Sequence, residues 1–138
     1  MPTTKEFSVR IKDRPGTLGD VCRALADRGV NILAFQSLPF EKESLVRFVV
    51  DNPTTAKSIL EGQKFPFTET EVAQVKFPNR PGELARAASQ LGEAGINIDY
   101  SYSGLDSSTN APLLIFAVAN ADRAAKILEK ASAAAVGA

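Results

Sequence analysis

The sequence predicts an α+β protein made of two tandem copies of one strand–helix–strand–strand–helix–strand unit, over residues 1–70 and 71–138. Two observations support this prediction. The motif Arg-Pro-Gly-x-Leu occurs at residues 14–18 and again at residues 80–84. In each copy the hydrophobic pattern also changes from a period of two to a period of about 3.6, which indicates strands followed by helices.

The similarity between the two copies extends well beyond this motif, as expected for a repeated structural unit. The shift along the chain that aligns the two motifs also aligns Val9 with Val75, Leu25 with Leu91, Gly29 with Gly95, Asn31 with Asn97, and Ile32 with Ile98. A second block, which pairs Phe48 with Phe116 and Leu60 with Leu128, aligns only when this shift is lengthened by two positions. The second copy therefore has two additional residues, which we place in the turn region at residues 104–110.

The first copy begins with a strand and a helix. Phe7, Val9 and Ile11 alternate with polar residues, which is typical of a half-buried strand. The Pro15-Gly16 pair is expected to begin the helix, because proline is tolerated in a first helical turn. The apolar positions that follow have helical spacing and predict one buried face: Leu18, Val21, Cys22, Leu25 and Ala26.

A hairpin and a second helix complete the first copy. Gly29 is expected to end the first helix in the left-handed conformation. A strand over residues 30–38 and another over residues 45–50 form the hairpin, with its turn near Glu41, and a helix covers residues 54–62. Residues 65–77 would then close the first copy and open the second without a Gly/Ser linker.

The closing strand of the second copy is expected to be weak. The first copy has Phe65-Pro66-Phe67 where the second has Ala133-Ala134-Ala135. Without bulky anchors, this last strand would be shortened, frayed or replaced by a continuation of the helix.

Composition excludes several classes of function. Sixteen basic and sixteen acidic residues cancel, so we expect neither nucleic acid nor a membrane surface as a partner. The chain has no histidine and a single cysteine, Cys22, so no metal site, cofactor or imidazole-based catalysis is expected. No apolar run approaches the roughly 20 residues of a membrane span, and the N-terminus has no signal pattern. A cytoplasmic location is therefore expected.

The predicted element order is the ferredoxin-like arrangement, which serves many unrelated functions, so the function depends on the motifs. The segments at residues 13–16 and 29–32, and their counterparts Asn-Arg-Pro-Gly at 79–82 and Gly-Ile-Asn-Ile at 95–98, resemble the ACT domain. This domain is a ligand-binding unit that regulates enzymes of amino-acid metabolism. The second copy resembles in particular the serine-binding ACT domain of phosphoglycerate dehydrogenase, and the tandem layout resembles free-standing double-ACT proteins. The resemblance implies allosteric regulation by a free amino acid, bound between repeats or between subunits, without catalysis.

The candidate ligand-binding residues lie in these segments. In the second copy they are Asn79, Arg80, Pro81, Gly82, Glu83, Leu84, Asn97 and Ile98, and in the first copy Asp13, Pro15, Gly16, Thr17, Leu18, Asn31 and Ile32. A helix that begins directly after a turn leaves its first amides unpaired at the positive end of the helix dipole, which suits a carboxylate. The resemblance places the two asparagines on the same effector, although both also follow helix-ending glycines, where asparagine often satisfies only backbone groups.

The two copies differ at the residue before the turn, which is Asp13 in the first and Asn79 in the second. Since an anion beside a helix N-terminus competes with a ligand carboxylate, the second copy is expected to bind a carboxylate better.

Three alternatives remain beside amino-acid sensing. The first is a regulatory subunit that acts on a separate amino-acid biosynthetic enzyme through protein contact. The second is an RNA-binding protein that stacks bases on aromatic residues such as Tyr100, Tyr102, Phe48 and Phe116. The third is an enzyme, which would have to rely on isolated carboxylates such as Asp99 and Asp106. A homodimer is expected in every case, because small sheets cover their free edges.

Overall fold

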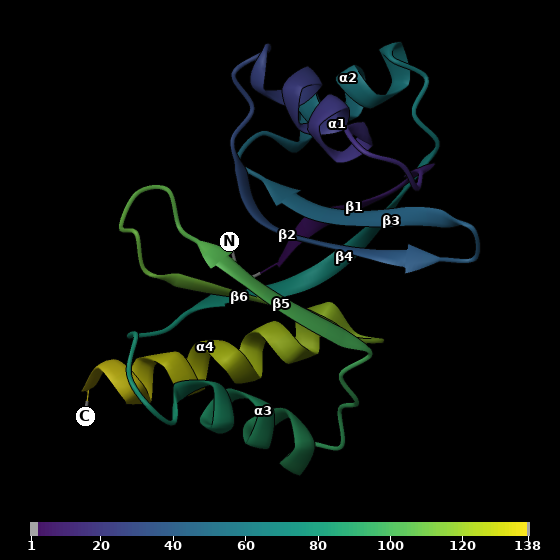
Figure 1. The fold of residues 1–138 in the computed structure, drawn as a ribbon. Coiled ribbons are helices and arrows are strands. Elements are labelled where there is room, and N and C mark those ends of the chain that lie inside the picture. The colour runs from purple at the N-terminus through teal and green to yellow at the C-terminus, as the bar shows by residue number, and fades with distance from the viewer. Residues whose placement is uncertain (1–2, 138) are drawn as a thin grey trace. The chain divides into compact units, whose positions relative to one another are not determined.

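The computed structural model describes residues 3–137 of the chain and the side chains of residues 3–130. The chain divides into two compact units, of which the first is Lys5–Thr70 and the second contains Glu71–Ala138 with the start of the first strand. In the described residues, helices and strands alternate as predicted, with six strands and four helices in two α+β units (Figure 1). Each unit is described separately below.

The first unit is a three-stranded antiparallel arrangement with two helices on one face (Figure 1). Its elements are β1 (Thr3–Lys12), α1 (Thr17–Ala26), β2 (Ile32–Phe40), β3 (Glu43–Val50) and α2 (Pro53–Gly62). Strand β3 lies in the middle, and its Phe48 is opposite Phe7 of β1 and Phe35 of β2. Strand β4 (Phe67–Lys76) then runs out of the first unit into the second, so one continuous strand closes one copy and opens the next, as predicted.

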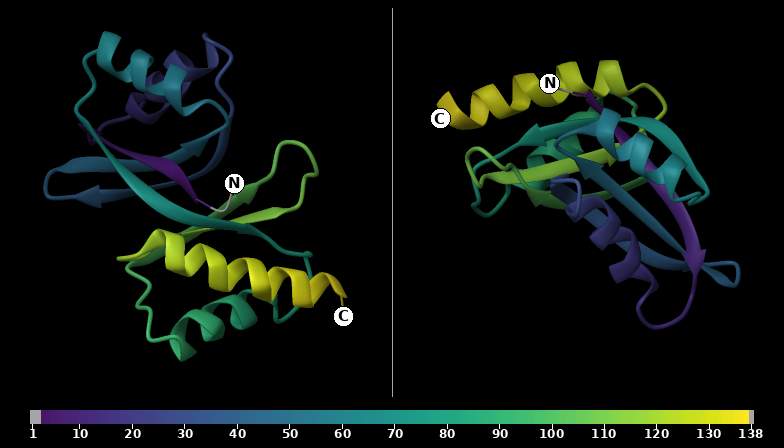
Figure 2. Two further views of the ribbon diagram at one scale, coloured as in Figure 1. Left: turned by 180° about the vertical axis from the view of Figure 1, so that it is seen from behind. Right: turned by 90° about the horizontal axis from the view of Figure 1, so that it is seen from above.

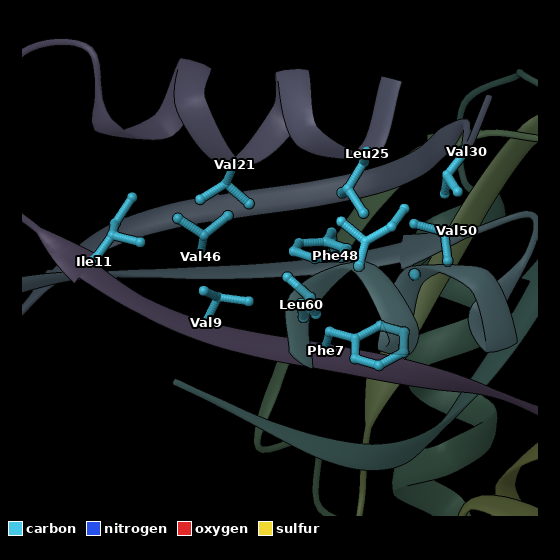
Figure 3. Packing of buried hydrophobic residues seen from close by; sticks show 12 residues of the cluster. Phe7, Val9, Ile11, Val21, Leu25, Val30, Val46, Phe48, Val50 and Leu60 are labelled. Carbon is cyan, nitrogen blue, oxygen red and sulfur yellow. The ribbon is translucent and has the colours of Figure 1, made fainter. Parts of the chain in front are cut away.

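The core of the first unit lies between its strands and its helices. Figure 3 shows Val21 and Leu25 of α1 pointing toward Val46 and Phe48 of β3. The rings of Phe7 and Phe48 have centroids 5.8 Å apart. Burying each large apolar side chain contributes about 1.5–3 kcal/mol, so this cluster is a major source of stability for the unit.

The second unit repeats this arrangement (Figure 2). It contains the second half of β4, then α3 (Glu83–Glu93), β5 (Tyr100–Leu105), β6 (Pro112–Ala117) and α4 (Ala121–Gly137). Strand β6 pairs antiparallel with both β5 and β4. Its core gathers residues that match those of the first core, among them Leu91 for Leu25, Phe116 for Phe48 and Leu128 for Leu60.

Left-handed glycines end α1 and α3 as predicted. Gly29 has a φ of 74° and Gly95 a φ of 75°. The amide of Val30 donates to the carbonyl of Leu25 at 3.1 Å, and the amide of Ile96 donates to Leu91 at 2.9 Å. Because these bonds hold the residue after each glycine in the helix-ending turn, that residue does not join the next strand. Strand β2 therefore begins at residue 32 and covers residues 32–40 instead of the predicted 30–38.

The segment that matches the closing strand of the first copy is helical. Helix α4 runs for 17 residues to Gly137, so the tail continues the helix, one of the three outcomes open from the sequence. Alanine has the highest intrinsic helix propensity, and the tail offers no aromatic anchor for a strand. Neither α4 nor any other described helix combines the length and the apolar character needed to cross a membrane.

The aromatic residues considered for RNA binding do not form an open stacking surface. Phe48 and Phe116 are each 1% exposed and belong to the two cores. Tyr100 and Tyr102 are half-buried on β5, where they alternate with exposed serines. Bases cannot stack on the two phenylalanines, because both rings are occupied in core packing.

Candidate functional site

The two strand-to-helix turns have the same backbone geometry. Gly16 and Gly82 are the N-cap residues of α1 and α3, with φ values of 93° and 90°, and no side chain caps either helix. In both turns the first helical residue donates to the carbonyl of the arginine three positions earlier, at 3.4 Å for Thr17 and 3.5 Å for Glu83. The turn predicted from Pro-Gly is therefore present twice. One detail of the prediction is wrong: the proline lies before the N-cap glycine and not in the first helical turn.

Each turn presents unpaired backbone donors. The amides of Leu18 and Gly19 in α1, and of Leu84 and Ala85 in α3, have no hydrogen-bond acceptor among the described residues. The first bonds that continue into the helices are donated by the amides of Asp20 and Arg86 to the carbonyls of the N-cap glycines, at 3.1 and 2.9 Å. Free amides at the positive end of a helix form the anion-accepting arrangement expected from the sequence.

The turn glycines are required by backbone conformation, and each faces open space. A side chain added at Gly16 or Gly82 would meet nothing within 4 Å, but the positive φ would strain it. A ligand group can therefore reach the turn backbone from this side. The glycine itself is explained without a ligand, since residues with a Cβ avoid this region.

A helix lies between the two candidate polar residues of each copy. Asn79 precedes α3 and Asn97 follows it, and a helix of 11 residues is roughly 16 Å long. The same separation holds for Asp13 and Asn31 about α1, which has 10 residues. The hypothesis that Asn79 and Asn97 steady one amino acid therefore stays a prediction.

The asparagines after the helices already have local partners. The backbone of Asn31 exchanges two bonds with Asp51, whose carboxylate accepts from the Asn31 amide at 2.9 Å. The side chain of Asn97 donates to Asp99 at 3.1 Å, and both residues are exposed. Ile32 and Ile98 pack against their respective cores. Asn31 takes part through its backbone, and the Asn97 side chain bonds a carboxylate, so neither contact is the backbone-satisfying role of an asparagine side chain that was considered from the sequence.

The residues that precede the turns are exposed in both copies. The carboxylate of Asp13 accepts a hydrogen bond from the Ser44 hydroxyl of β3 at 3.1 Å. The side chain of Asn79 has no hydrogen-bond partner among the described residues, and it lies free in solvent. Neither side chain is buried against the helix terminus that follows it.

Glu83 is the residue at these turns whose environment the sequence did not reveal. It is the first residue of α3, is only 5% exposed, and accepts a bond at 2.6 Å from Nε of Arg80. Its second carboxylate oxygen, Oε2, is buried with no hydrogen-bond partner. The second turn thus contains a buried anion of its own, which removes the reason to expect better carboxylate binding there. An acid in a first helical turn, three residues after an arginine, was the signal available in the sequence.

Asp106, the other carboxylate considered for catalysis, holds its own loop together. It accepts from the hydroxyls of Ser108 at 2.7 Å and Thr109 at 2.8 Å, and from both backbone amides. These bonds, led by the one from Ser108, lower the pKa of Asp106 from 3.8 to about 2. A carboxylate with so low a pKa is a poor general base near neutral pH.

Comparison with known proteins agrees with the duplicated fold. The family model for the ACT domain pair matches residues 2–135. No curated protein sequence matches significantly. Among solved structures, protein BT0572 from Bacteroides thetaiotaomicron is 26% identical, with a TM-score of 0.80 over 94% of this chain and 88% of that chain.

Two regulatory subunits of aspartate kinase have the same fold. The ligand-free subunit from Thermus thermophilus is 20% identical with a TM-score of 0.62, over 94% of this chain and 92% of that chain. The subunit from Thermus flavus is 18% identical with a TM-score of 0.61, over 95% and 93%. With the turn and the helix stop both duplicated, and with the family match over nearly the whole length, this chain belongs to the ACT domain family as a pair of ACT domains.

Proposed function

We propose that this ACT domain pair is an amino-acid-responsive regulatory module without catalysis of its own. The observation that carries the proposal is the pair of uncapped helix N-termini, each with free amides beside a left-handed glycine that faces open space. A carboxylate is the group best suited to such amides, because it accepts several bonds and opposes the positive end of the dipole. Free amino acids, the effectors associated with the family, supply that group.

The chemistry of the acidic side chains also favours binding over catalysis. The carboxylate of Asp106 accepts hydrogen bonds from its own loop. The carboxylate of Asp99 accepts a bond from the Asn97 side chain, and the Asp99 amide donates to the carbonyl of Ala117. Asp106 also forms an ion pair at 3.9 Å with the ammonium of Lys76, which further favours its ionised form. A ligand-binding role needs no general acid or base.

A thermal-shift screen of the twenty amino acids tests the proposal. A ligand that binds only the native state stabilises it by about 2.7 kcal/mol when its concentration is 100 times its Kd. We expect at least one amino acid to raise the melting temperature in a saturable way. The amide of that amino acid, which lacks the carboxylate, should have a much smaller effect. The proposal fails if none of the twenty raises the melting temperature above that of a sodium chloride control.

We also propose that the module self-associates and acts on an amino-acid biosynthetic enzyme through protein contact. Phe35 on β2 and Leu105 on β5 are 53% and 56% exposed, which favours a role in contacts with other molecules. Light scattering at micromolar concentration should give the mass of a homodimer, and copurification from the native cell should recover the enzyme. A constant monomer mass would contradict the first statement without affecting ligand binding.

A further inference from the structure

The chain passes from one unit to the other inside strands and not inside loops. The boundaries of the two units fall between Thr4 and Lys5 in β1, and between Thr70 and Glu71 in β4. These boundaries are separated by the same shift that aligns the two Arg-Pro-Gly motifs, so they occupy one position of the repeat. The crossing is therefore a property of the repeated unit, because it occurs at the matching residue of each copy.

The first part of β4 is anchored in the first unit. Phe67 packs against the first core, and its ring centroid lies 5.9 Å from that of Phe7. The carboxylate of Glu69 forms an ion pair at 3.3 Å with the ammonium of Lys57 in α2. Since this ion pair is partly exposed, the aromatic contact is the stronger of the two anchors.

The second part of β4 is anchored in the second unit. Ala73 and Val75 are buried in the second core and lie opposite Phe116 and Leu114 of β6. Phe77, which follows the strand directly, is 2% exposed in the same core. The turn before α3 comes next along the chain. The strand that leads into this turn is therefore held at its other end by the core of the first unit.

No residue between these anchors favours a hinge. Strand β4 has ten residues and contains neither glycine nor proline. The segment that crosses the boundary, residues 68–72, is Thr-Glu-Thr-Glu-Val, in which three of the five side chains are β-branched and favour extended backbone. Unfolding of the second unit would release residues 71–76, and with them the continuation of the strand that closes the first unit.

Two separate cores would by themselves allow the units to open independently. The two clusters share no residue in the part of the chain that the structure describes, and regions with separate cores can unfold separately. We propose instead that the crossing strands, β4 above all, join the two units into one cooperative unit. A gain or loss of stability in either unit is then passed to the other. Because each candidate turn follows a crossing strand, a molecule bound at either turn stabilises both units.

Native-state hydrogen exchange of the full chain, followed by nuclear magnetic resonance, tests this proposal. Ala56→Gly in α2 and Ala124→Gly in α4 change matching residues that are both fully buried, and neither residue lies on a crossing strand. Glycine inside a helix should lower the protection of the slowest-exchanging amides at least about fivefold. We expect each variant to produce this loss in both units, whichever unit contains the substitution.

A break in β4 tests whether the strand transmits the effect. Four residues, Gly-Ser-Gly-Ser, are inserted between Thr70 and Glu71, which are both exposed. The same insertion between the exposed residues Glu41 and Lys42 lengthens the tip of the β2–β3 hairpin and is the control. With the break, we expect each glycine variant to lower protection only in its own unit. With the control insertion, both units should still lose protection together.

Two results would overturn the proposal. One is a loss of protection confined to the substituted unit in a chain without insertions. The other is a loss that is still shared after the insertion in β4, because the coupling would then not depend on this strand. Should the chain with that insertion fail to fold, the double variant Thr70→Gly, Glu71→Gly loosens the same point without lengthening the strand, and the same two readings decide.

Discussion

Replacing Gly16 by alanine is expected to destabilise the protein, whereas the same replacement at Gly19 is expected to stabilise it. Both residues lie at the start of α1, and a Cβ at either one would meet nothing within 4 Å. They differ in backbone conformation, since Gly16 has a φ of 93° and Gly19 is an ordinary helical residue. The pair therefore isolates the effect of the left-handed N-cap.

The magnitude follows from two opposing contributions. Alanine in a left-handed conformation costs roughly 1–2 kcal/mol, and any glycine-to-alanine change recovers about 0.4–1 kcal/mol by restricting the unfolded chain. Gly16→Ala should therefore lose about 0.5–1 kcal/mol. Gly19→Ala should gain about 0.5–1 kcal/mol, because glycine is a poor residue inside a helix. The two variants should differ by about 1–2 kcal/mol.

Urea unfolding followed by far-ultraviolet circular dichroism measures both free energies, and it suits a chain that has no tryptophan. The second repeat offers an independent copy of the test in Gly82→Ala and Gly92→Ala, with the same conformational contrast and the same open space. Equal stability of Gly16→Ala and Gly19→Ala would refute the argument, since the conformational strain would then be absent.

The other predictions concern the core, a helix cap and one carboxylate. Leu25→Ala removes a fully buried side chain and should cost about 2–5 kcal/mol in urea unfolding, whereas Leu84→Ala, 56% exposed, should stay within about 0.5 kcal/mol. Asn52→Ala removes the side-chain cap of α2 and should cost about 1 kcal/mol by the same measurement; no loss would mean that water replaces the cap. The pKa of Asp106 in the folded protein is about 2, below its ordinary value of 3.8. The ionised carboxylate therefore stabilises the native state above about pH 4, and this stabilisation is lost as the pH falls toward 2. Carboxyl resonances should titrate near pH 2 in the wild type and at a higher pH in Ser108→Ala, and an unchanged midpoint would contradict the assigned cause.

The repeat, the element order and the turns were predictable from the sequence because they depend on neighbouring residues. Arg-Pro-Gly at residues 14–16 and Gly29 each specify a local backbone conformation, and each recurs at the matching position of the second copy. The left-handed φ values at Gly16 and Gly29 are the expected result. Helical spacing also predicted the two residues of α1 that are buried in the core, Val21 and Leu25. Of the other residues of the predicted stripe, Leu18 and Cys22 are half-buried, and Ala26 is exposed.

Burial of individual polar groups was decided only by the tertiary structure. From its neighbours, Glu83 is an ordinary acidic residue in a first helical turn, and only the packed unit shows it 5% exposed with an oxygen that has no partner. Helix α3 likewise lies between Asn79 and Asn97, so the common contact with one effector that the resemblance implies stays a prediction. Backbone conformation is set by a few residues along the chain, whereas exposure and proximity depend on how distant segments pack together. The sequence by itself therefore determined where the candidate turns lie, and the tertiary structure decided that one of them contains its own anion.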